Sequence, residues 1–180
     1  SEHIIHGILE SHGLPPELIY LCMIESGFNP DAVSRASAVG LWQFMEVTGR
    51  EYGLITDPWI DERRDPIKST EAAARHLKDL NETFGDWALS FAAYNAGIGS
   101  VHRAIRQTQS NDFWRIASEG ALPLEATRYV PKIMAAMLVG KNPGQFGLGE
   151  VKRSSSWAFA MVRTPGGTDL ERMASRTGVP

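Results

Sequence analysis

The chain has 180 residues, of which 43% are hydrophobic and 22% are charged, as is ordinary for one soluble globular domain with a short appendage. Lys and Arg number 18 and Asp and Glu 21, so the net charge is −3, which argues against a nucleic-acid-binding protein with a basic face. The single cysteine, Cys22, excludes an intrachain disulfide and a cysteine-based zinc site. No stretch is long and apolar enough to cross a bilayer, so we expect no transmembrane segment.

Apolar residues at helical spacing, interrupted by Gly and Pro, predict a mainly α domain over most of the chain. Residues 27 to 40, which are rich in Asn, Asp, Ser and Gly, are expected to form a loop. The predicted helices cover residues 4–12, 15–26, 41–52, 67–84, 87–94, 101–108, 113–119 and 125–139.

The second predicted helix is apolar on nearly all sides, which indicates a place in the middle of the domain. It carries one acid, Glu25, in its last turn, and Gly27 and Pro30 end it. Burial among apolar neighbours raises the pKa of a carboxyl group, and the helix dipole acts in the same direction at this end. A carboxyl that stays protonated near pH 7 suits a general acid. The alternative is a Glu side chain that turns outward into solvent.

Two polar clusters further along the chain can serve such an acid. Ser34 can donate a hydrogen bond that orients it, and Gln43 can both donate to and accept from sugar hydroxyl and acetamido groups. Residues 40–45 also offer flat or soft apolar surface for sugar rings. In the second cluster, Tyr94 and Asn95 supply polar groups at a helix end, although a satisfied buried hydroxyl is an equally good interpretation of Tyr94.

The order and spacing of these residues resemble the soluble-lytic-transglycosylase family over about residues 11 to 140. The matching elements are Glu25-Ser26-Gly27-Phe28-Asn29-Pro30, Ser34, Gly40-Leu41-Trp42-Gln43, Ala92 to Gly97, Glu125 and Tyr129-Val130-Pro131. The elements most similar to the membrane-bound lytic transglycosylase D group are Trp42, Thr48-Gly49-Arg50, Tyr52-Gly53-Leu54 and Asp61-Glu62-Arg63-Arg64-Asp65-Pro66.

This resemblance implies a lysozyme-like helical domain that cuts peptidoglycan between N-acetylmuramic acid and N-acetylglucosamine. Glu25 would act as sole acid and then as base, and the muramoyl C6 hydroxyl would close a 1,6-anhydro ring. The residues implied to bind substrate or support the acid are Ser34, Gly40, Gln43, Met45, Tyr94, Asn95, Glu125 and Tyr129.

The resemblance also implies a cellular setting and a set of partners. We expect a monomer that needs no metal or organic cofactor and that acts on peptidoglycan glycan strands rather than on nucleic acid. It implies residence in the periplasm or cell envelope, and it allows an outer-membrane anchor in the full-length protein.

Glycosidases usually flank the scissile bond with two carboxyl groups, but no second acid in this sequence has an obvious paired placement. Asp31, Asp57 and Asp61 are expected to be solvated or capping residues. A single-acid mechanism needs no such partner. Two alternatives stay open: a muramidase of the same fold that hydrolyses the bond, and a catalytically inactive glycan-binding module.

Three positions depart from the family pattern. Ser37 stands where glycine is usual, Glu46 where proline is usual, and Ala126 where threonine is usual. The five histidines show no metal-ligand spacing, and we expect them to lie in solvent.

The composition changes after Lys141, and we expect the catalytic domain to end near residue 147. Residues 148–180 then form a linker, a strand over 157–162, a turn, and a short helix that Thr168 or Asp169 caps and that ends at Gly178. The segment 162–179 resembles the first half of a LysM glycan-binding repeat. An extension unrelated to LysM is the alternative.

Overall fold

The structure is a computed structural model that describes residues 2–149, 165 and 167–177. Its elements, with short 3₁₀ helices labelled η, are α1 (Glu2–Ser11), η1 (Pro16–Leu18), α2 (Ile19–Ser26), α3 (Glu46–Glu51), η2 (Glu62–Arg64), α4 (Pro66–Phe84), α5 (Trp87–Ala96), α6 (Ile98–Thr108), α7 (Phe113–Ser118), α8 (Leu124–Lys141), η3 (Pro143–Phe146) and α9 (Leu170–Thr177). The only β-structure among the described residues is a few isolated β-bridges between the helices, so the mainly α prediction is confirmed. None of these helices is long and apolar enough to cross a membrane.

Several helix boundaries differ from the predicted ones, and two of these differences bear on the candidate site. The sequence predicts a helix from residue 41, but α3 begins only at Glu46, because Gly40 and Gln43 adopt positive φ angles of 86° and 50° that no α-helix contains. In the other case, α5 continues through Asn95 to Ala96 and ends at Gly97. Asn95 therefore lies on the last turn of a helix.

The C-terminal prediction is only partly covered by the described residues. The predicted terminal helix is α9, and the cap expected at its start is provided by Asp169, whose carboxylate accepts a hydrogen bond from the backbone N–H of Arg172 at 3.1 Å. The predicted strand over 157–162 lies outside the described residues. The boundary near residue 147 and the LysM interpretation stay predictions.

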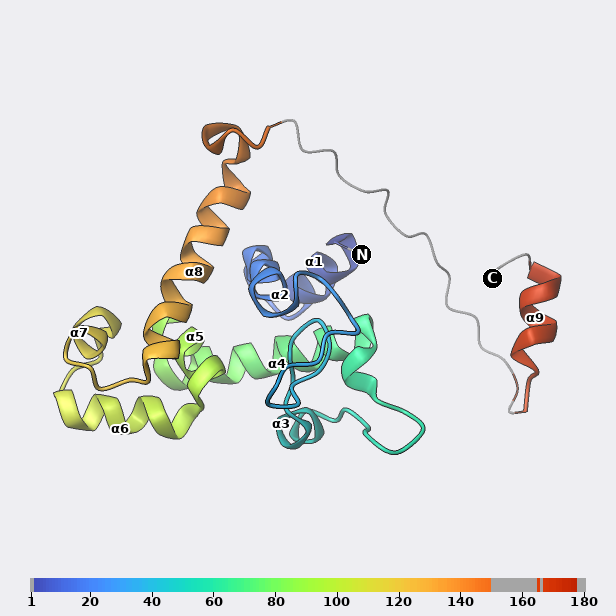
Figure 1. The fold of residues 1–180 in the computed structure, drawn as a ribbon, viewed down its shortest axis with the longest axis horizontal. Helices are drawn as coiled ribbons and strands as arrows, with labels where there is room; N and C mark the ends of the chain where they lie inside the picture. Colours follow the sequence, from blue (N-terminus) through green and yellow to red (C-terminus); the bar gives the residue numbers. More distant parts are fainter. Residues whose placement is uncertain (1, 150–164, 166, 178–180) are drawn as a thin grey trace.

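Helix α5 occupies the centre of the domain and packs against α4, α6 and α8. Its buried residues face several neighbours at once, as the almost wholly apolar sequence predicts. Helix α2 packs against α8, and α1 packs against α4. Figure 1 shows α6 and α7 together at one end of α4 and α5, while α8 rises beside α2. We call α4, α5 and α8, with the helices packed on them, the helical body.

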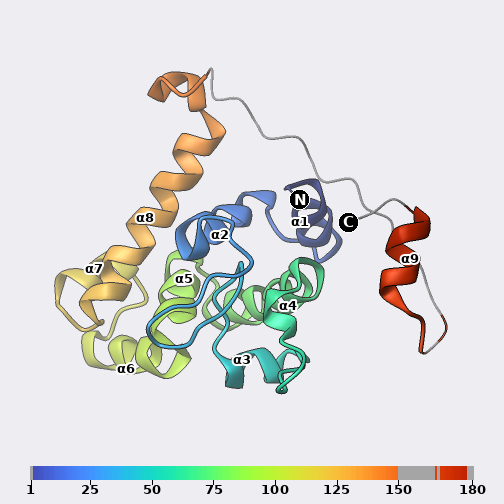
Figure 2. The ribbon, with the colours of Figure 1, turned by 45° about the vertical axis from the view of Figure 1, so that its right-hand side comes forward.

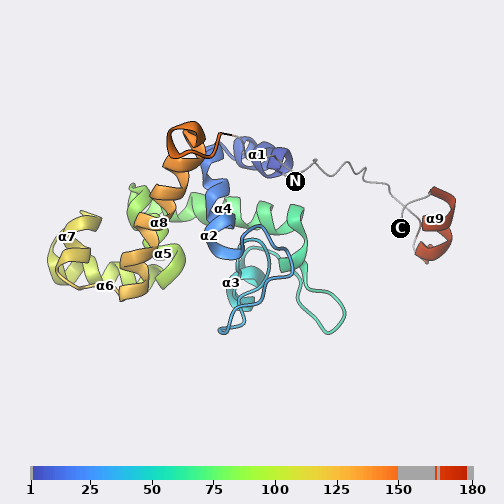
Figure 3. The ribbon, with the colours of Figure 1, turned by 45° about the horizontal axis from the view of Figure 1, so that its top comes forward.

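Residues 27–65, which we call the loop layer, contain α3 and η2 and connect α2 to α4. Figure 2 shows this layer in front of α4 and α5, and Figure 3 shows it on the opposite side of α4 from α1. The fully buried indole of Trp42 attaches the layer to α4, because its Nε1 donates to Thr70 Oγ1 at 2.9 Å. The loop layer therefore forms a wall against the helical body.

Arg63 and Gly40 set the internal shape of the loop layer. The buried Arg63 guanidinium pairs with Asp61 and donates from Nη1 to the carbonyl oxygens of Ser37, at 3.3 Å, and Phe44, at 3.2 Å. At Gly40, an added Cβ would lie 1.9 Å from the carbonyl oxygen of Arg63. Only glycine permits this approach of the two backbone segments.

Candidate active site

Glu25 lies in the last turn of α2, as predicted, and its side chain is half-buried. The helix ends at Gly27, which has a left-handed φ of 60° and donates its N–H to carbonyl oxygens of the last turn. The neighbouring Ser26 hydroxyl lies 2.9 Å from the carbonyl oxygen of Leu41 and donates to it. The end of α2 is thus attached to the loop layer next to the acid.

The carboxyl group of Glu25 is partly protonated near neutral pH. Burial, helped by the negative charge of Glu125, raises its pKa from 4.5 to about 7. Tyr129 opposes both effects, because its hydroxyl donates a hydrogen bond to Glu25 Oε1 and so favours the carboxylate. The expected rise in pKa is confirmed, and the outward-turned alternative is wrong because the carboxyl contacts Tyr129 inside the domain.

Two tyrosines from different helices approach this acid. Tyr129 is buried on α8, and Tyr94 is half-buried on α5. Burial, together with the charge of Glu25, holds the pKa of both phenols well above the usual value, so both remain hydrogen-bond donors. Tyr94 uses its hydroxyl to donate to the carbonyl oxygen of Trp42 at 2.7 Å. The interpretation of Tyr94 as a satisfied hydroxyl therefore holds, and its ring stays next to the acid.

Glu125 is a second acid near Glu25, although the sequence pattern does not mark the two as a pair. It is exposed in the first turn of α8, and its Oε1 lies 3.5 Å from Nδ2 of Asn95. The sequence spacing could have shown that Glu125 lies near Glu25, because Glu125 and Tyr129 stand four residues apart and therefore share one helix face. A tyrosine on that face bonded to Glu25 brings the glutamate on the same face close to it.

Ser34 and Gln43 make contacts other than those expected. The Ser34 hydroxyl accepts from the backbone N–H of Ala38 at 3.0 Å, and no hydrogen bond between described residues joins it to Glu25. The reason is local, since Ser34 closes a tight turn with residue 38. Gln43 donates from Nε2 to the carbonyl oxygens of Ala32, at 3.2 Å, and Gly40, at 2.9 Å. Both side chains shape the loop layer.

Of the remaining expected site residues, Met45 is 46% exposed and Gly40 is buried. Met45 keeps an apolar surface open to solvent beside Gln43. Gly40 contributes by letting its backbone lie close to the carbonyl oxygen of Arg63.

Asp31, Asp57 and Asp61 are the solvated or capping residues that the sequence predicts. Asp57 accepts from two backbone N–H groups of its own loop, and Asp61 caps η2 and pairs with Arg63. Asp31 is exposed and lies 3.4 Å from Arg64.

A pocket of about 230 Å³ opens next to Tyr94, between α3, α4 and α5. Its lining residues are Gln43, Phe44, Met45, Thr48, Glu51, His76, Ala93, Tyr94, Gly97 and Ile98. The expectation of solvated histidines is wrong for two of them. His76 is half-buried among aromatic rings, and His12 lies 2.7 Å from Glu71. No group of side chains that could hold a metal ion occurs among the residues that the structure describes.

The family model of the transglycosylase SLT domain matches residues 3–117. This chain belongs to that family. Among curated relatives, membrane-bound lytic murein transglycosylase D of Escherichia coli (strain K12) is 38% identical over 180 residues, covering 97% of this chain and 39% of its own length. The SLT-family resemblance expected from the motifs is thereby confirmed.

Solved structures agree with the fold of this SLT domain. An inactive mutant of lytic transglycosylase Slt from Pseudomonas aeruginosa superposes with a TM-score of 0.65 at 23% identity, covering 81% of this chain and 24% of that one. The 70-kDa soluble lytic transglycosylase of Escherichia coli gives a TM-score of 0.65 at 23% identity, over 75% of this chain and 23% of that one. The chain therefore spans 39% of the curated relative's length and about a quarter of each of these two solved chains.

Proposed function

We propose that this SLT domain is a peptidoglycan lytic transglycosylase that cleaves the β-1,4 bond between N-acetylmuramic acid and N-acetylglucosamine. The observation that carries the proposal is Glu25, whose pKa of about 7 lets one carboxyl group both give and take a proton near neutral pH. Family membership supports it, because the curated relative at 38% identity bears the name of a murein transglycosylase. Such an enzyme works where peptidoglycan is, in the cell envelope.

Glu25 acts twice in the proposed reaction. Its carboxyl proton passes to the glycosidic oxygen as the bond from that oxygen to the anomeric carbon breaks, which leaves Glu25 as a carboxylate. This carboxylate then takes the proton of the muramoyl C6 hydroxyl, whose oxygen forms the new bond to the anomeric carbon. The products are a free N-acetylglucosamine hydroxyl and a 1,6-anhydromuramoyl end, and Glu25 returns to its starting state without a water molecule.

Tyr129 orients the acid for these steps. Its hydroxyl occupies Oε1 of Glu25, so Oε2 is the oxygen left to meet the glycosidic bond. The Tyr129 hydrogen bond also strengthens when Glu25 becomes a carboxylate, which keeps the intermediate state accessible. The remaining candidate residues are proposed to line or shape the groove that holds the glycan strand. They are Tyr94, Asn95, Glu125, Ser34, Gly40, Gln43 and Met45.

One observation favours the hydrolytic alternative, a muramidase of the same fold. Glu125 is a second carboxylate close enough to raise the pKa of Glu25, and an exposed carboxylate can activate water. The two functions differ in their products, because an anhydro end is one water lighter than a hydrolysed reducing end.

Mass analysis of digested, purified sacculi tests the proposal. We expect wild type to release anhydro-muropeptides, and we expect Glu25→Gln to keep the fold while its rate drops by about a thousandfold or more, since general acid-base catalysis is lost. Glu125→Gln should still form anhydro products, with its alkaline activity limit moved to lower pH because the raised pKa of Glu25 relaxes. Hydrolysed reducing ends from wild type would contradict the proposed transglycosylase and support the muramidase. If Glu25→Gln cleaved sacculi at the wild-type rate, Glu25 would not be the catalytic acid.

The pH profile of activity tests the same group in a second way. Protonation of the glycosidic oxygen needs neutral Glu25, so activity should fall as the pH rises through about 7, the pKa of its carboxyl. Undiminished turnover at strongly alkaline pH would contradict the assignment.

A further inference from the structure

Trp59 lies almost wholly in solvent, in the connection between α3 and α4. It is 93% exposed, more than any other large apolar residue that the structure describes, and the adjacent Ile60 is 52% exposed. Figures 1 and 3 show this connection projecting away from the helices. A single exposed apolar side chain is common on protein surfaces. Trp59 differs because hydrogen bonds hold its backbone in place on both sides.

Residues 55–62, which we call the Trp59 hairpin, are closed at their base by hydrogen bonds. The N–H of Glu62 donates to the carbonyl oxygen of Ile55 at 2.9 Å, and the N–H of Ile55 donates to the Glu62 carboxylate at 2.8 Å. From α3, Arg50 donates through Nη2 to the carbonyl oxygen of Thr56 at 2.8 Å. The base of the hairpin is therefore closed on itself and attached to α3.

Asp57 fixes the tip of the Trp59 hairpin. Its Oδ1 accepts hydrogen bonds from the N–H groups of Trp59, at 2.7 Å, and Ile60, at 2.8 Å. Pro58, which follows Asp57, has its φ angle fixed by its own ring. No hydrogen bond in the described part of the chain uses the second carboxylate oxygen of Asp57, Oδ2, which leaves an acceptor at the tip. A backbone that is fixed before binding loses little further freedom when a ligand contacts the indole ring.

The charges around the hairpin argue against an anionic partner, such as a bilayer surface rich in acidic lipids. Binding to such a surface is driven by a cluster of free Lys or Arg side chains. Four cations adjoin the hairpin, through a hydrogen bond or through the sequence, and each of them forms an ion pair with a carboxylate of this chain. They are Arg50, Arg63, Arg64 and Lys68. The hairpin therefore presents a flat apolar ring and a carboxylate oxygen to a ligand that carries no strong negative charge.

We propose that the Trp59 hairpin binds a sugar ring of peptidoglycan away from the bond that Glu25 cuts. One face of a pyranose ring consists largely of C–H groups and stacks on a flat indole ring. The hydroxyl and acetamido N–H groups at the edge of the sugar donate to a carboxylate oxygen such as Oδ2 of Asp57. This inference rests on the proposed function, which supplies the glycan strand as the ligand.

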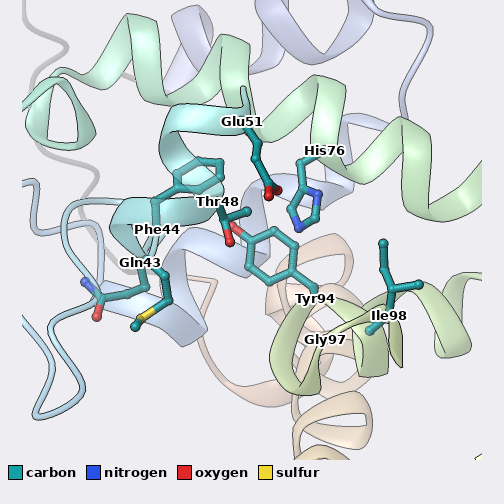
Figure 4. A pocket seen from close by; sticks show the side chains of 10 residues that line it. Gln43, Phe44, Thr48, Glu51, His76, Tyr94, Gly97 and Ile98 are labelled. Carbon is teal, nitrogen blue, oxygen red and sulfur yellow. The ribbon is translucent and has the colours of Figure 1, made fainter. Parts of the chain in front are cut away.

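The Trp59 hairpin is attached to the wall beside the candidate active site. Phe44 of the loop layer lines the pocket next to Tyr94 (Figure 4). The Arg63 guanidinium donates to the carbonyl oxygen of Phe44 at 3.2 Å and pairs with Asp61 of the hairpin at 2.8 Å. The hairpin is thus held at a fixed place relative to the site. Two contacts with one polymer hold the enzyme more tightly than either contact alone, so the hairpin keeps it on the sacculus between cuts.

Sedimentation with purified sacculi tests the inference in the inactive Glu25→Gln protein. Adding Trp59→Ala should weaken binding about tenfold, and Trp59→Tyr, which restores a flat ring, should recover most of it. Trp114→Ala is the matched control, because Trp114 is also exposed, at 54%, but lies on α7 at the other side of the domain (Figure 1). It should bind as its parent does. Circular dichroism checks that each variant is folded.

Two further ligands identify what the hairpin binds. The loss in Trp59→Ala should be as large for soluble glycan strands stripped of their peptide stems as for sacculi. Vesicles of phosphatidylglycerol and phosphatidylethanolamine should show no binding that depends on Trp59.

The inference is wrong if Trp59→Ala binds sacculi as tightly as its parent, or if Trp114→Ala weakens binding equally. A loss confined to strands that carry stems would make the ligand a peptide, and vesicle binding that Trp59→Ala abolishes would make it a lipid, so either result also contradicts the inference. Release of anhydro-muropeptides by wild type is measured separately. If that release fails while Trp59-dependent binding of glycan persists, the proposed function is wrong and this inference stands.

Discussion

In the helical body, α4, α5 and α8 pack through apolar side chains that are almost fully buried, such as Leu77, Leu89 and Ile133. In the loop layer, residues 27–65, much of the shape comes from hydrogen bonds between side chains and backbone, such as those of Arg63 and Gln43. Apolar packing tolerates change gradually, whereas each such hydrogen bond depends on a particular atom. Glu25 lies where the two parts meet.

The difference explains how the site divides its tasks. The helical body supplies the acid, through Glu25 on α2, and its hydrogen-bond donor, through Tyr129 on α8. The loop layer supplies the facing wall, which Tyr94 connects to α5 through the carbonyl of Trp42. Changes in the loop layer should therefore alter substrate binding and the stability of that layer, while changes at Glu25 should alter the chemistry and the stability of the body.

The largest stability effect is expected from Gly40→Ala in the loop layer. Its Cβ would stand 1.9 Å from a backbone oxygen, and the φ of 86° is unfavourable for alanine, so the loss should be about 4 kcal/mol. Urea unfolding measures it. Gly53→Ala is the matched control, because Gly53 has a φ of 85° but nothing within 4 Å of the added Cβ. It should cost only about 1–2 kcal/mol. Equal losses would show that the backbone contact is unimportant.

Glu25→Gln should stabilise the protein, and only at higher pH. Between pH 4.5, its ordinary pKa, and about 7, its pKa in the fold, the folded protein holds a proton that the unfolded chain has released. Wild-type stability therefore falls as the pH rises through this window. Glutamine has no proton to lose, so Glu25→Gln should be more stable by up to about 3 kcal/mol at pH 8.

Unfolding free energies measured from pH 4 to pH 8 check this expectation. The two curves should converge below pH 4.5 and separate up to about pH 7. Glu125→Gln serves as control, since this exposed acid repels Glu25 and otherwise makes only a long contact with Asn95, so its substitution should give a much smaller gain. A constant difference at all pH values would show that packing, and not ionisation, separates Glu25→Gln from wild type.

The sequence predicts the helical body better than the loop layer, and the reason lies in the contacts that form each. The apolar pattern of α5 and the Gly27 stop after Glu25 are local features, and both appear where expected. The predicted start of α3 is five residues too early. Its true start depends on positive φ angles at Gly40 and Gln43, which arise from contacts with residues distant in the chain.

The same limit applies to the candidate site. The raised pKa of Glu25 follows from its apolar helix, but the pairing of Ser34 with Ala38 depends on a turn geometry that residue types alone do not specify. His76 gives no signal in the sequence either. Its aromatic neighbours come from the end of α3, from α5 and from the loop before α3, and only the folded chain brings them together.

Ser37→Gly is expected to give the smallest change, a gain of about 0.5 kcal/mol. Ser37 has a φ of 65°, which is unfavourable for a residue with a Cβ, and relief of this strain is partly offset by the greater freedom of glycine in the unfolded chain. Its backbone oxygen still accepts from Arg63, so the loop layer keeps its shape.

Gln109→Gly is the matched control for Ser37→Gly in the helical body. Gln109 has a φ of 51° at the end of α6, but its side chain donates to the carbonyl oxygen of Arg106 at 2.7 Å. Substitution there relieves similar strain and loses this hydrogen bond, so the gain should disappear. Thermal unfolding compares the two. If Ser37→Gly loses stability, the serine side chain itself makes a stabilising contact at this turn. The loop layer would then be held by side-chain contacts there as well as by hydrogen bonds to the backbone.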